Sequence, residues 1–420
     1  MRITILCSGT RGDVQPYLAL GLGLQHIGHT VTLAASNVFE SWIRGAGLGF
    51  ASVRLNPQEV LQNHDVQQSV LGHKNSLGFF MHFPEYIRTL LPLFTNLFND
   101  IWQASQNTEF IVASLTTLVG YDCAAKLNCP SCLVSLLPME PTTEFPSFLL
   151  PPGPALGGVY NRLTHILVEK MSWLGMRTLN QWRKNTLGLA PLSMNLFAHW
   201  RARRVPVLHA WSPAVLSKPH DWPTWDHVTG YWFLEPQAGF QPPSALLQFL
   251  EAGSPPVYIG FGSMIAEDPR RLTEMALAAL QLTGQRGILL SGWSGLSSTK
   301  LPETVFCLEE TPHAWLFPQM AAAVHHGGAG TLGASLRAGI PTIVTPFLLD
   351  QFGWGKVVSN LRVGPKSIPA KKLTAEKLAA AIQIAVTDTS MQTRAAEIGK
   401  KIRSEDGIAN AIEIINQISA

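Results

Sequence analysis

A histidine pair followed at once by a glycine-rich corner is the feature that most restricts what this chain can fold into. Residues 324–331 read VHHGGAGT, with an apolar run before them and a helical pattern from Thr331 onward. This order is typical of a buried strand that turns sharply into the N-terminus of a helix in an α/β protein. The first N–H groups of a helix lack partners within the helix, and the helix dipole adds positive character, so such a corner binds phosphate.

A second pair of polar residues supports the same interpretation. Asp350 and Gln351 follow the next apolar run, at residues 342–345, and can hold the hydroxyl groups of a sugar. Of the two histidines, His326 is expected to donate a hydrogen bond to a phosphoryl oxygen, whereas His325 is expected to pack inside the protein. The pattern therefore predicts a site for a nucleotide sugar.

Composition narrows the class of protein. The length of 420 residues suggests two domains, and the net charge of +3 is too small for a protein that binds nucleic acid through charge. No run of about eighteen apolar residues predicts a membrane span. Residues 3–6 form a strand-length run rather than a signal peptide. These two observations predict a cytoplasmic location. The C-x-x-C pair, Cys129 and Cys132, lacks a second pair for zinc, so we expect reduced thiols.

Apolar runs alternate with helical patterns in both halves of the chain. Strands are expected at 2–7, 30–35, 110–114 and 131–136, and then at 256–260, 287–291, 305–308, 321–324 and 342–345. Helices are expected at 14–27, 118–126, 269–283 and 331–338, with a final one along 408–418. Such alternation predicts an α/β protein with doubly wound parallel sheets. We expect Rossmann-like domains at 1–208 and 244–395, an inter-domain linker at 209–243, and a C-terminal helix at 396–420 that packs back toward the first domain.

The motifs of the second half resemble the donor-binding signature of family 1 glycosyltransferases. Its parts appear in order as WLFPQ at 315–319, HHGGAGT at 325–331 and GIPTIVTP at 339–346, followed by Asp350-Gln351. The resemblance implies the GT-B fold, in which two Rossmann-like domains face one another across a cleft. It assigns donor contacts to Ser263, Trp293, His326, Gly328, Gly330, Thr331, Asp350 and Gln351. For Trp293, packing in the core is an equally good explanation.

The resemblance also implies an inverting transfer that needs no cofactor besides the nucleotide sugar. No D-x-D motif, which holds a metal-bridged diphosphate in the other large transferase fold, is present in the chain. A helix N-terminus can replace the metal. We therefore expect no metal site.

Residues 9–16, GTRGDVQP, follow the first expected strand and precede the first expected helix. Family members commonly carry a histidine as general base here, whereas sterol glucosyltransferases and antibiotic-tailoring enzymes carry an aspartate. The resemblance thus assigns to Asp13 the removal of the acceptor's proton. Asp13 can also serve as the N-cap of the helix, and the two roles are compatible. Thr10 and Arg11 are expected near the diphosphate, although Arg11 could equally pair with a carboxylate.

Further motifs resemble sterol 3β-glucosyltransferases, among them TGYWFL at 229–234 and PHAWLFP at 312–318. Ala314 departs from the aspartate that is common there. The resemblance implies UDP-glucose as donor and a sterol or another apolar alcohol as acceptor. An aromatic stripe that includes Phe83, Tyr86 and Leu90 can line an apolar acceptor site or belong to the core.

Contact with a membrane is a further expectation. The region 173–204 is rich in tryptophan and in basic residues, which could touch anionic lipid. A solvated helix face explains the same residues more simply.

Three functions stay open at this point. The first is an inverting glucosyltransferase acting on sterols or similar lipids. The second is a transferase for a polyketide, flavonoid or other natural-product aglycone, with a UDP- or dTDP-sugar. The third is a non-catalytic homologue that binds nucleotide sugars, and the presence of both Asp13 and His326 argues against it.

Overall fold

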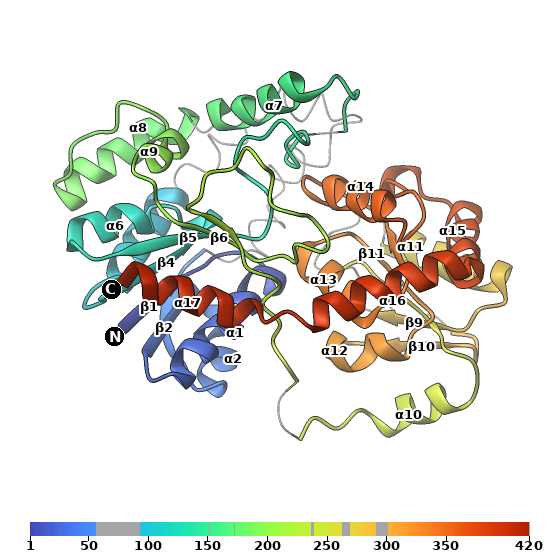
Figure 1. The fold of residues 1–420 in the computed structure, drawn as a ribbon. Coiled ribbons are helices and arrows are strands. Elements are labelled where there is room, and N and C mark those ends of the chain that lie inside the picture. Colours follow the sequence, from blue (N-terminus) through green and yellow to red (C-terminus); the bar gives the residue numbers. More distant parts are fainter. Residues whose placement is uncertain are drawn as a thin grey trace. The chain divides into compact units, whose positions relative to one another are not determined.

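The computed structural model describes residues 1–55, 93–150, 152–171, 173–236, 239–262, 269–290 and 301–419 (Figure 1). The chain forms two compact units. The first comprises Met1–Trp211, Lys218–Leu234 and Asp406–Ala420, and the second comprises Ser212–Ser217 and Glu235–Glu405. No helix in the described ranges is both long and apolar enough to cross a bilayer.

The first unit is built on a seven-stranded sheet with the order β3-β2-β1-β4-β5-β6-β7, in which every neighbouring pair is parallel. The strands are β1 Arg2–Leu6, β2 Thr30–Ser36, β3 Gly49–Val53, β4 Phe110–Ser114, β5 Ser131–Ser135, β6 Val207–His209 and β7 Asp226–Val228. Four of them agree with the predicted strands to within one residue. The other three, β3, β6 and β7, were not predicted, and β7 lies within residues 209–243.

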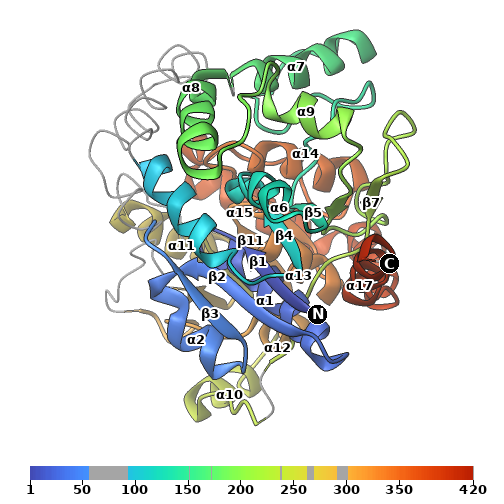
Figure 2. The same ribbon diagram turned by 90° about the vertical axis from the view of Figure 1, so that its left-hand side faces the viewer.

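Helices cover both faces of this sheet because alternate strand residues point to opposite sides. The helices of this unit are α1 Arg11–His26, α2 Glu40–Gly45, a helix over 93–104, α6 Gly120–Leu127, α7 Gly158–Met171, α8 Trp173–Trp182, α9 Leu196–Ala202 and α17 Gly407–Ser419. Residues of α1, α2 and α17 bury one face, and residues of 93–104, α6, α8 and α9 bury the other. Figure 2 shows α7, α8 and α9 gathered at the same end of the first unit.

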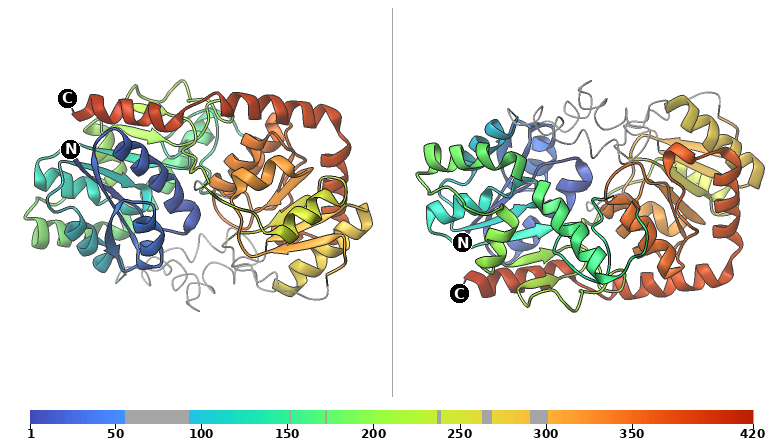
Figure 3. Two further views of the ribbon diagram at one scale, coloured as in Figure 1. Left: turned by 90° about the horizontal axis from the view of Figure 1, so that it is seen from below. Right: turned by 90° about the horizontal axis from the view of Figure 1, so that it is seen from above.

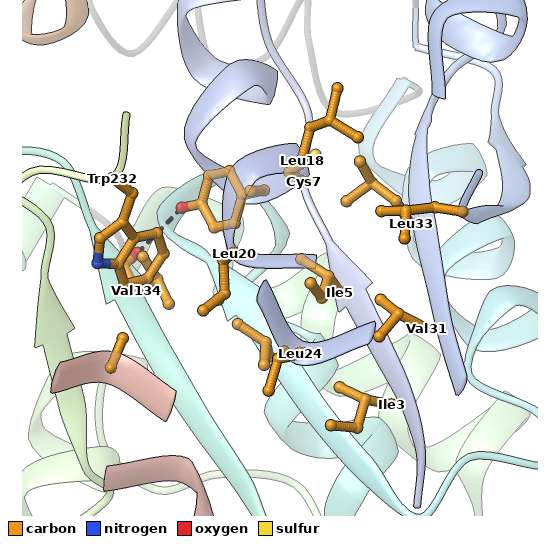
Figure 4. Close-up of a cluster of buried hydrophobic side chains, with 14 of the residues drawn as sticks. Ile3, Ile5, Cys7, Leu18, Leu20, Leu24, Val31, Leu33, Val134 and Trp232 are labelled. Atoms are coloured by element: carbon orange, nitrogen blue, oxygen red, sulfur yellow. Dashed lines mark hydrogen bonds between the residues drawn. The ribbon is translucent and has the colours of Figure 1, made fainter. Parts of the chain in front are cut away.

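The core beneath α1 ties the strands to the segment that follows β7. Ile3, Ile5, Val31 and Leu33 all face this core (Figure 4). Tyr17 of α1 donates a hydrogen bond from its hydroxyl to the carbonyl oxygen of Val134 at 3.4 Å, and its ring meets the edge of Trp232 at 6.1 Å between centroids. The start of α1 is therefore fixed against β1 and β5.

The last helix of the chain completes this core. Ala411 and Ile415 of α17 are fully buried within it, and α17 lies beside α1 (Figures 1 and 3). A Cβ atom at Gly23 would come within 2.5 Å of Ile408. The absence of a side chain at Gly23 therefore allows the two helices to approach closely.

The second unit carries a five-stranded parallel sheet with the order β10-β9-β8-β11-β12. The strands are β8 Val257–Gly260, β9 Gly287–Leu290, β10 Val305–Leu308, β11 Ala322–His325 and β12 Thr342–Val344. The helices are α10 Ser244–Glu251, α11 Pro269–Thr283, α12 His313–Leu316, α13 Ala329–Ala338, α14 Gln351–Leu361, α15 Ala375–Thr387 and α16 Thr389–Arg403. The predicted strands agree with these to within one residue at each end. Residues of α11 and α15 bury one face, and residues of α10 and α12 bury the other.

Both sheets share one strand order. Counted within each unit, the third, second, first, fourth and fifth strands lie side by side in that sequence. The direction of winding reverses between β1 and β4 in the first unit and between β8 and β11 in the second. Doubly wound sheets bind ligands at the carboxyl ends of the strands at this reversal point. The topology thus selects the loops after these four strands as the place to look for a site.

Candidate functional site

The loop after β1 holds the carboxylate of Asp13 in the first turn of α1. Thr10 is the N-cap residue, and Asp13 is the third residue of the helix. Asp13 Oδ2 accepts hydrogen bonds from the Thr10 N–H at 2.7 Å and from the Thr10 hydroxyl at 3.0 Å. The prediction that Asp13 itself is the N-cap is therefore wrong. The helix starts three residues earlier than expected because Thr10 and Asp13 close a capping box.

The glycine before this pair makes room for the carboxylate. Gly9 has φ of +144°, and a Cβ atom there would lie 2.4 Å from Asp13 Oδ2. Burial raises the pKa of the Asp13 carboxyl above its usual value, and the hydrogen bonds from Thr10 oppose the rise. A carboxylate whose pKa is shifted toward neutrality is better suited to accept a proton than a fully solvated one.

Two threonines after β4, which were not among the predicted site residues, bond to the loop after β1. The hydroxyl of Thr116 donates to the carbonyl oxygen of Ser8, and that of Thr117 donates to the carbonyl oxygen of Leu6, each at 2.7 Å. These bonds join the loops on either side of the reversal point. A run of hydroxyl residues directly after an apolar strand is the signal that could have identified them.

Arg11 takes a position that the sequence analysis did not consider. Its guanidinium lies over the ring of Trp42, with Cζ 4.9 Å from the ring centroid, which is the geometry of a cation–π contact. The side chain is nevertheless exposed.

The second corner joins β11 to α13 as predicted. His325 ends the strand, Gly328 is the N-cap, and the helix begins at Ala329. Gly330 and Thr331 therefore lie in its first turn, where backbone N–H groups have no acceptor within the helix. Gly327 has φ of +93°, and a Cβ atom there would lie 2.6 Å from Val344, so both the turn and the packing favour glycine.

The imidazole of His326 lies close to Gly328 of this corner and to Gly262 after β8. A Cβ atom at Gly262 would be 2.9 Å from its Cε1, and one at Gly328 would be 2.4 Å from its Nε2. Gly262 follows β8, so His326 sits at the reversal point of the second sheet. Burial lowers the pKa of His326 to about 4, which keeps the ring neutral near pH 7. A neutral ring carries one N–H that can donate to a ligand oxygen.

His325 supports the corner from inside the protein, as expected. It is fully buried, and its Nδ1 accepts the Gly327 N–H at 3.0 Å. Because Nδ1 is the acceptor, Nε2 carries the proton and faces the hydroxyl oxygen of Ser335 at 3.4 Å. Burial also lowers the pKa of His325 well below its usual value. His325 therefore fixes the turn that presents His326.

Asp350 and Gln351 lie where β12 leads into α14. Asp350 is the N-cap residue of α14, and Gln351 is its first residue. Gln351 Oε1 accepts the backbone N–H groups of Phe347 and Leu348, at 2.8 and 3.1 Å. The carboxamide oxygen thus holds the turn together. The backbone oxygen of Gln351 would lie 3.3 Å from a Cβ atom at Gly327, so the two loops adjoin.

Several predicted contacts lie outside the described residues. They are Ser263, Trp293, Phe83, Tyr86 and Leu90. The described end of the aromatic stripe belongs to the core, because Phe98 packs against Phe94 at 6.3 Å and against Trp182 at 5.4 Å between ring centroids. Trp354, which the sequence analysis did not assign to the site, is fully buried.

Domain families match both ends of the chain. Residues 3–119 match the glycosyltransferase family 28 N-terminal domain, and residues 289–418 match the erythromycin biosynthesis protein CIII-like C-terminal domain. The sterol 3-beta-glucosyltransferase of Emericella nidulans is 37% identical over 428 residues, an alignment that covers 99% of this chain and 30% of that protein. The chain therefore spans about 30% of the length of this relative.

Solved structures match the whole chain. The calicheamicin glycosyltransferase CalG4 matches with a TM-score of 0.69 and 16% identity over 99% of this chain and 97% of its own. The Streptomyces sp. SF2575 glycosyltransferase SsfS6, complexed with thymidine diphosphate, matches with a TM-score of 0.64 and 19% identity over 99% of both chains. Together with the two doubly wound sheets, these matches define a GT-B fold, as predicted. The two domain matches and the 37% identity support the predicted resemblance to family 1 glycosyltransferases.

Proposed function

We propose that this protein is an inverting glycosyltransferase that moves glucose from UDP-glucose to the hydroxyl of a sterol or another apolar alcohol, giving a β-glycoside. The observation that carries the proposal is the 37% identity to a sterol 3-beta-glucosyltransferase over 99% of the chain. The positions of Asp13 and His326, each at the reversal point of its own sheet, support it.

In this proposal the second unit binds the donor. The first-turn N–H groups of α13 and the N–H of His326 donate to the diphosphate, whose negative charge grows as the bond to the sugar breaks. A bound metal is not needed for this step, because the helix terminus supplies the positive character. Asp350 accepts hydrogen bonds from sugar hydroxyls, and Gln351 can only donate from Nε2 while its oxygen holds the turn. Ser263 and Trp293 remain proposed donor contacts.

The first unit activates the acceptor in the same proposal. The carboxylate of Asp13 removes the proton of the acceptor hydroxyl as its oxygen attacks the anomeric carbon, and UDP leaves from the opposite side. One C–O bond forms while another breaks, so an α-linked donor yields a β-linked product. The step requires Asp13 and the N-terminus of α13 to meet at one sugar in the substrate complex. The acceptor resides in a bilayer, so we also propose peripheral contact with the membrane.

A second candidate is transfer from a dTDP-sugar to a natural-product aglycone. The match to SsfS6 complexed with thymidine diphosphate favours it, although an identity of 19% supports the fold alone. Incubation with UDP- and dTDP-sugars and a mixture of sterol and phenolic acceptors, followed by mass spectrometry, separates the two. A glucosylated sterol formed only with UDP-glucose supports the first candidate, and a glycosylated phenol formed from a dTDP-sugar supports the second.

The same incubation tests whether the protein is an enzyme. If the protein binds the donor measurably but consumes neither donor nor acceptor, it is a non-catalytic nucleotide-sugar-binding protein instead.

A further inference from the structure

One side of α7, the segment just before it and the start of α8 expose large apolar side chains. These side chains, which we call the α7–α8 apolar face, are Leu156, Val159, Leu163, Leu167, Trp173 and Leu174. Val159, Leu163 and Leu167 are 77%, 56% and 51% exposed and are spaced four residues apart, so they share one side of α7. Single exposed leucines are ordinary on protein surfaces, but a run of this kind marks an interaction site.

The polar side of α7 points inward, which is the reverse of the usual arrangement in a helix that faces water. Thr164 accepts the Ser147 N–H at 2.8 Å, and His165 Nε2 lies 3.0 Å from the carbonyl oxygen of Phe145. Glu169 is buried, and its second carboxylate oxygen accepts a hydrogen bond from Arg201 at 2.7 Å. These hydrogen bonds fix the orientation of α7 about its axis, so the fold itself directs the leucines of α7 outward.

The exposed charges that α7, α8 and the residues just after them carry are positive. Arg162, Lys170, Arg177 and Lys184 are exposed on or next to α7 and α8. Glu169 is the only acidic residue between positions 145 and 204, and Arg201 neutralises it. The surface therefore combines outward apolar side chains with cations and exposes no carboxylate from its own segment.

We propose that the α7–α8 apolar face docks on the surface of an anionic lipid bilayer, with α7 lying in the plane of the interface. Apolar side chains enter the boundary between head groups and acyl chains, and flanking cations contact the lipid phosphates. A second copy of this chain presenting the same face would bring like charges together, which opposes self-association there. The inference rests on the proposed function in one respect: docking would bring the protein to an acceptor that lies in the bilayer.

The surface includes the start of the predicted region 173–204, whereas two arginines at the end of that region make other contacts. Arg201 is committed to buried carboxylates within the first unit, with a hydrogen bond to Glu140 at 3.0 Å, and Arg204 lies over the ring of Trp225 at 5.6 Å. We therefore place the lipid contact at Arg162, Lys170 and Arg177 and not at Arg201 or Arg204.

Flotation of the full chain with vesicles tests the proposal directly. The protein is mixed with vesicles of phosphatidylcholine alone or of phosphatidylcholine and phosphatidylglycerol in equal parts. We expect binding to the anionic vesicles, weaker binding to the neutral ones, and loss of binding in a Leu163→Ser/Leu167→Ser variant. An Arg162→Gln/Arg177→Gln variant should bind the anionic vesicles more weakly by about fivefold for each lost cation.

Leu282→Ser is the matched control, since Leu282 of α11 is 63% exposed on the second unit and should be irrelevant to binding. Thermal unfolding checks that every variant is folded. Equal binding of the leucine variant and the wild type, or no binding of the wild type to either vesicle, would overturn the proposal. So would a dimer in solution that the leucine substitutions dissociate. Sugar transfer to a water-soluble alcohol is measured in parallel: vesicle binding without transfer contradicts the proposed function alone, whereas transfer without vesicle binding contradicts only the docking surface.

Discussion

The ring of His326 covers Gly328 so closely that a Cβ atom at position 328 would lie 2.4 Å from Nε2. Gly328 has φ of −63°, a conformation that alanine adopts readily, so only the histidine ring excludes a side chain there. The N-cap of α13 and the orientation of His326 are therefore set by the same contact.

Gly328→Ala should displace His326 without unfolding the protein. We expect kcat/KM for sugar transfer to fall by about 100-fold, the typical result of a small misplacement of a reacting group. Gly45→Ala is the control, because nothing lies within 4 Å of a Cβ atom there. Activity of Gly328→Ala equal to that of the control would show that the position of His326 is unimportant.

Substitutions of Asp13 and Thr10 separate proton transfer from helix capping. Asp13→Asn keeps an acceptor for the Thr10 N–H, so we expect normal donor binding and a loss of transfer of roughly 10²- to 10⁴-fold. Thr10→Val removes only the hydroxyl that lowers the pKa of Asp13, so the acidic limb of the kcat/KM profile should move to higher pH. An unchanged profile in Thr10→Val, or near-full transfer in Asp13→Asn, would show that another group is the base.

His326 should make the protein less stable in acid. Its pKa is about 4 in the folded state against 6.5 in the unfolded chain, so the unfolded chain binds the proton more readily. The free energy of unfolding should fall as the pH drops from about 6.5 through about 4. His326→Gln should reduce this slope in denaturant titrations, while the share due to His325 and His209, whose pKa values are also lowered, persists. A histidine NMR titration with His326 near 6.5 would contradict the geometry.

Asp226 should make the free energy of unfolding fall as the pH rises, which is the opposite of the effect of His326. It is buried on β7, 4.0 Å from His209 Nε2, and burial raises its pKa to about 8. Because the folded-state pKa is raised, stability is greatest below about 4 and is lost as the pH rises through about 8. Asp226→Asn removes the charge, so its unfolding midpoint should change less than that of the wild type between pH 6 and 9. Parallel declines in the two proteins would exclude Asp226 as the cause.

Much of the fold could be predicted because buried parallel strands appear in the sequence as apolar runs. Helix α11 and strand β10 match their predicted bounds at both ends, since each is enclosed by proline, glycine or polar residues. Strand β7 could not be found in this way, because two of its three residues are Asp226 and His227. Such strands exist only because neighbouring strands provide their hydrogen bonds.

Candidate site residues could be proposed from the sequence, but their arrangement could not. The corner at His326 is local, so the sequence alone indicates a strand, a glycine turn and a helix. The order of strands in a sheet is a tertiary property, and it is this order that places Asp13 and His326 at reversal points. Likewise, no residue pattern predicts the hydrogen bond from the Phe347 N–H to Gln351 Oε1, because it depends on how the backbone folds.

The return of α17 to the first unit has a consequence for biosynthesis. Ala411 and Ile415 seal the apolar side of α1, yet they are made after the whole of the second unit. While the ribosome is still adding β8 through α16, the side of α1 that packs against α17 is uncovered, and this core cannot be completed until residue 415 has been added. The core of the first unit is therefore begun before the second unit is synthesised and completed after it.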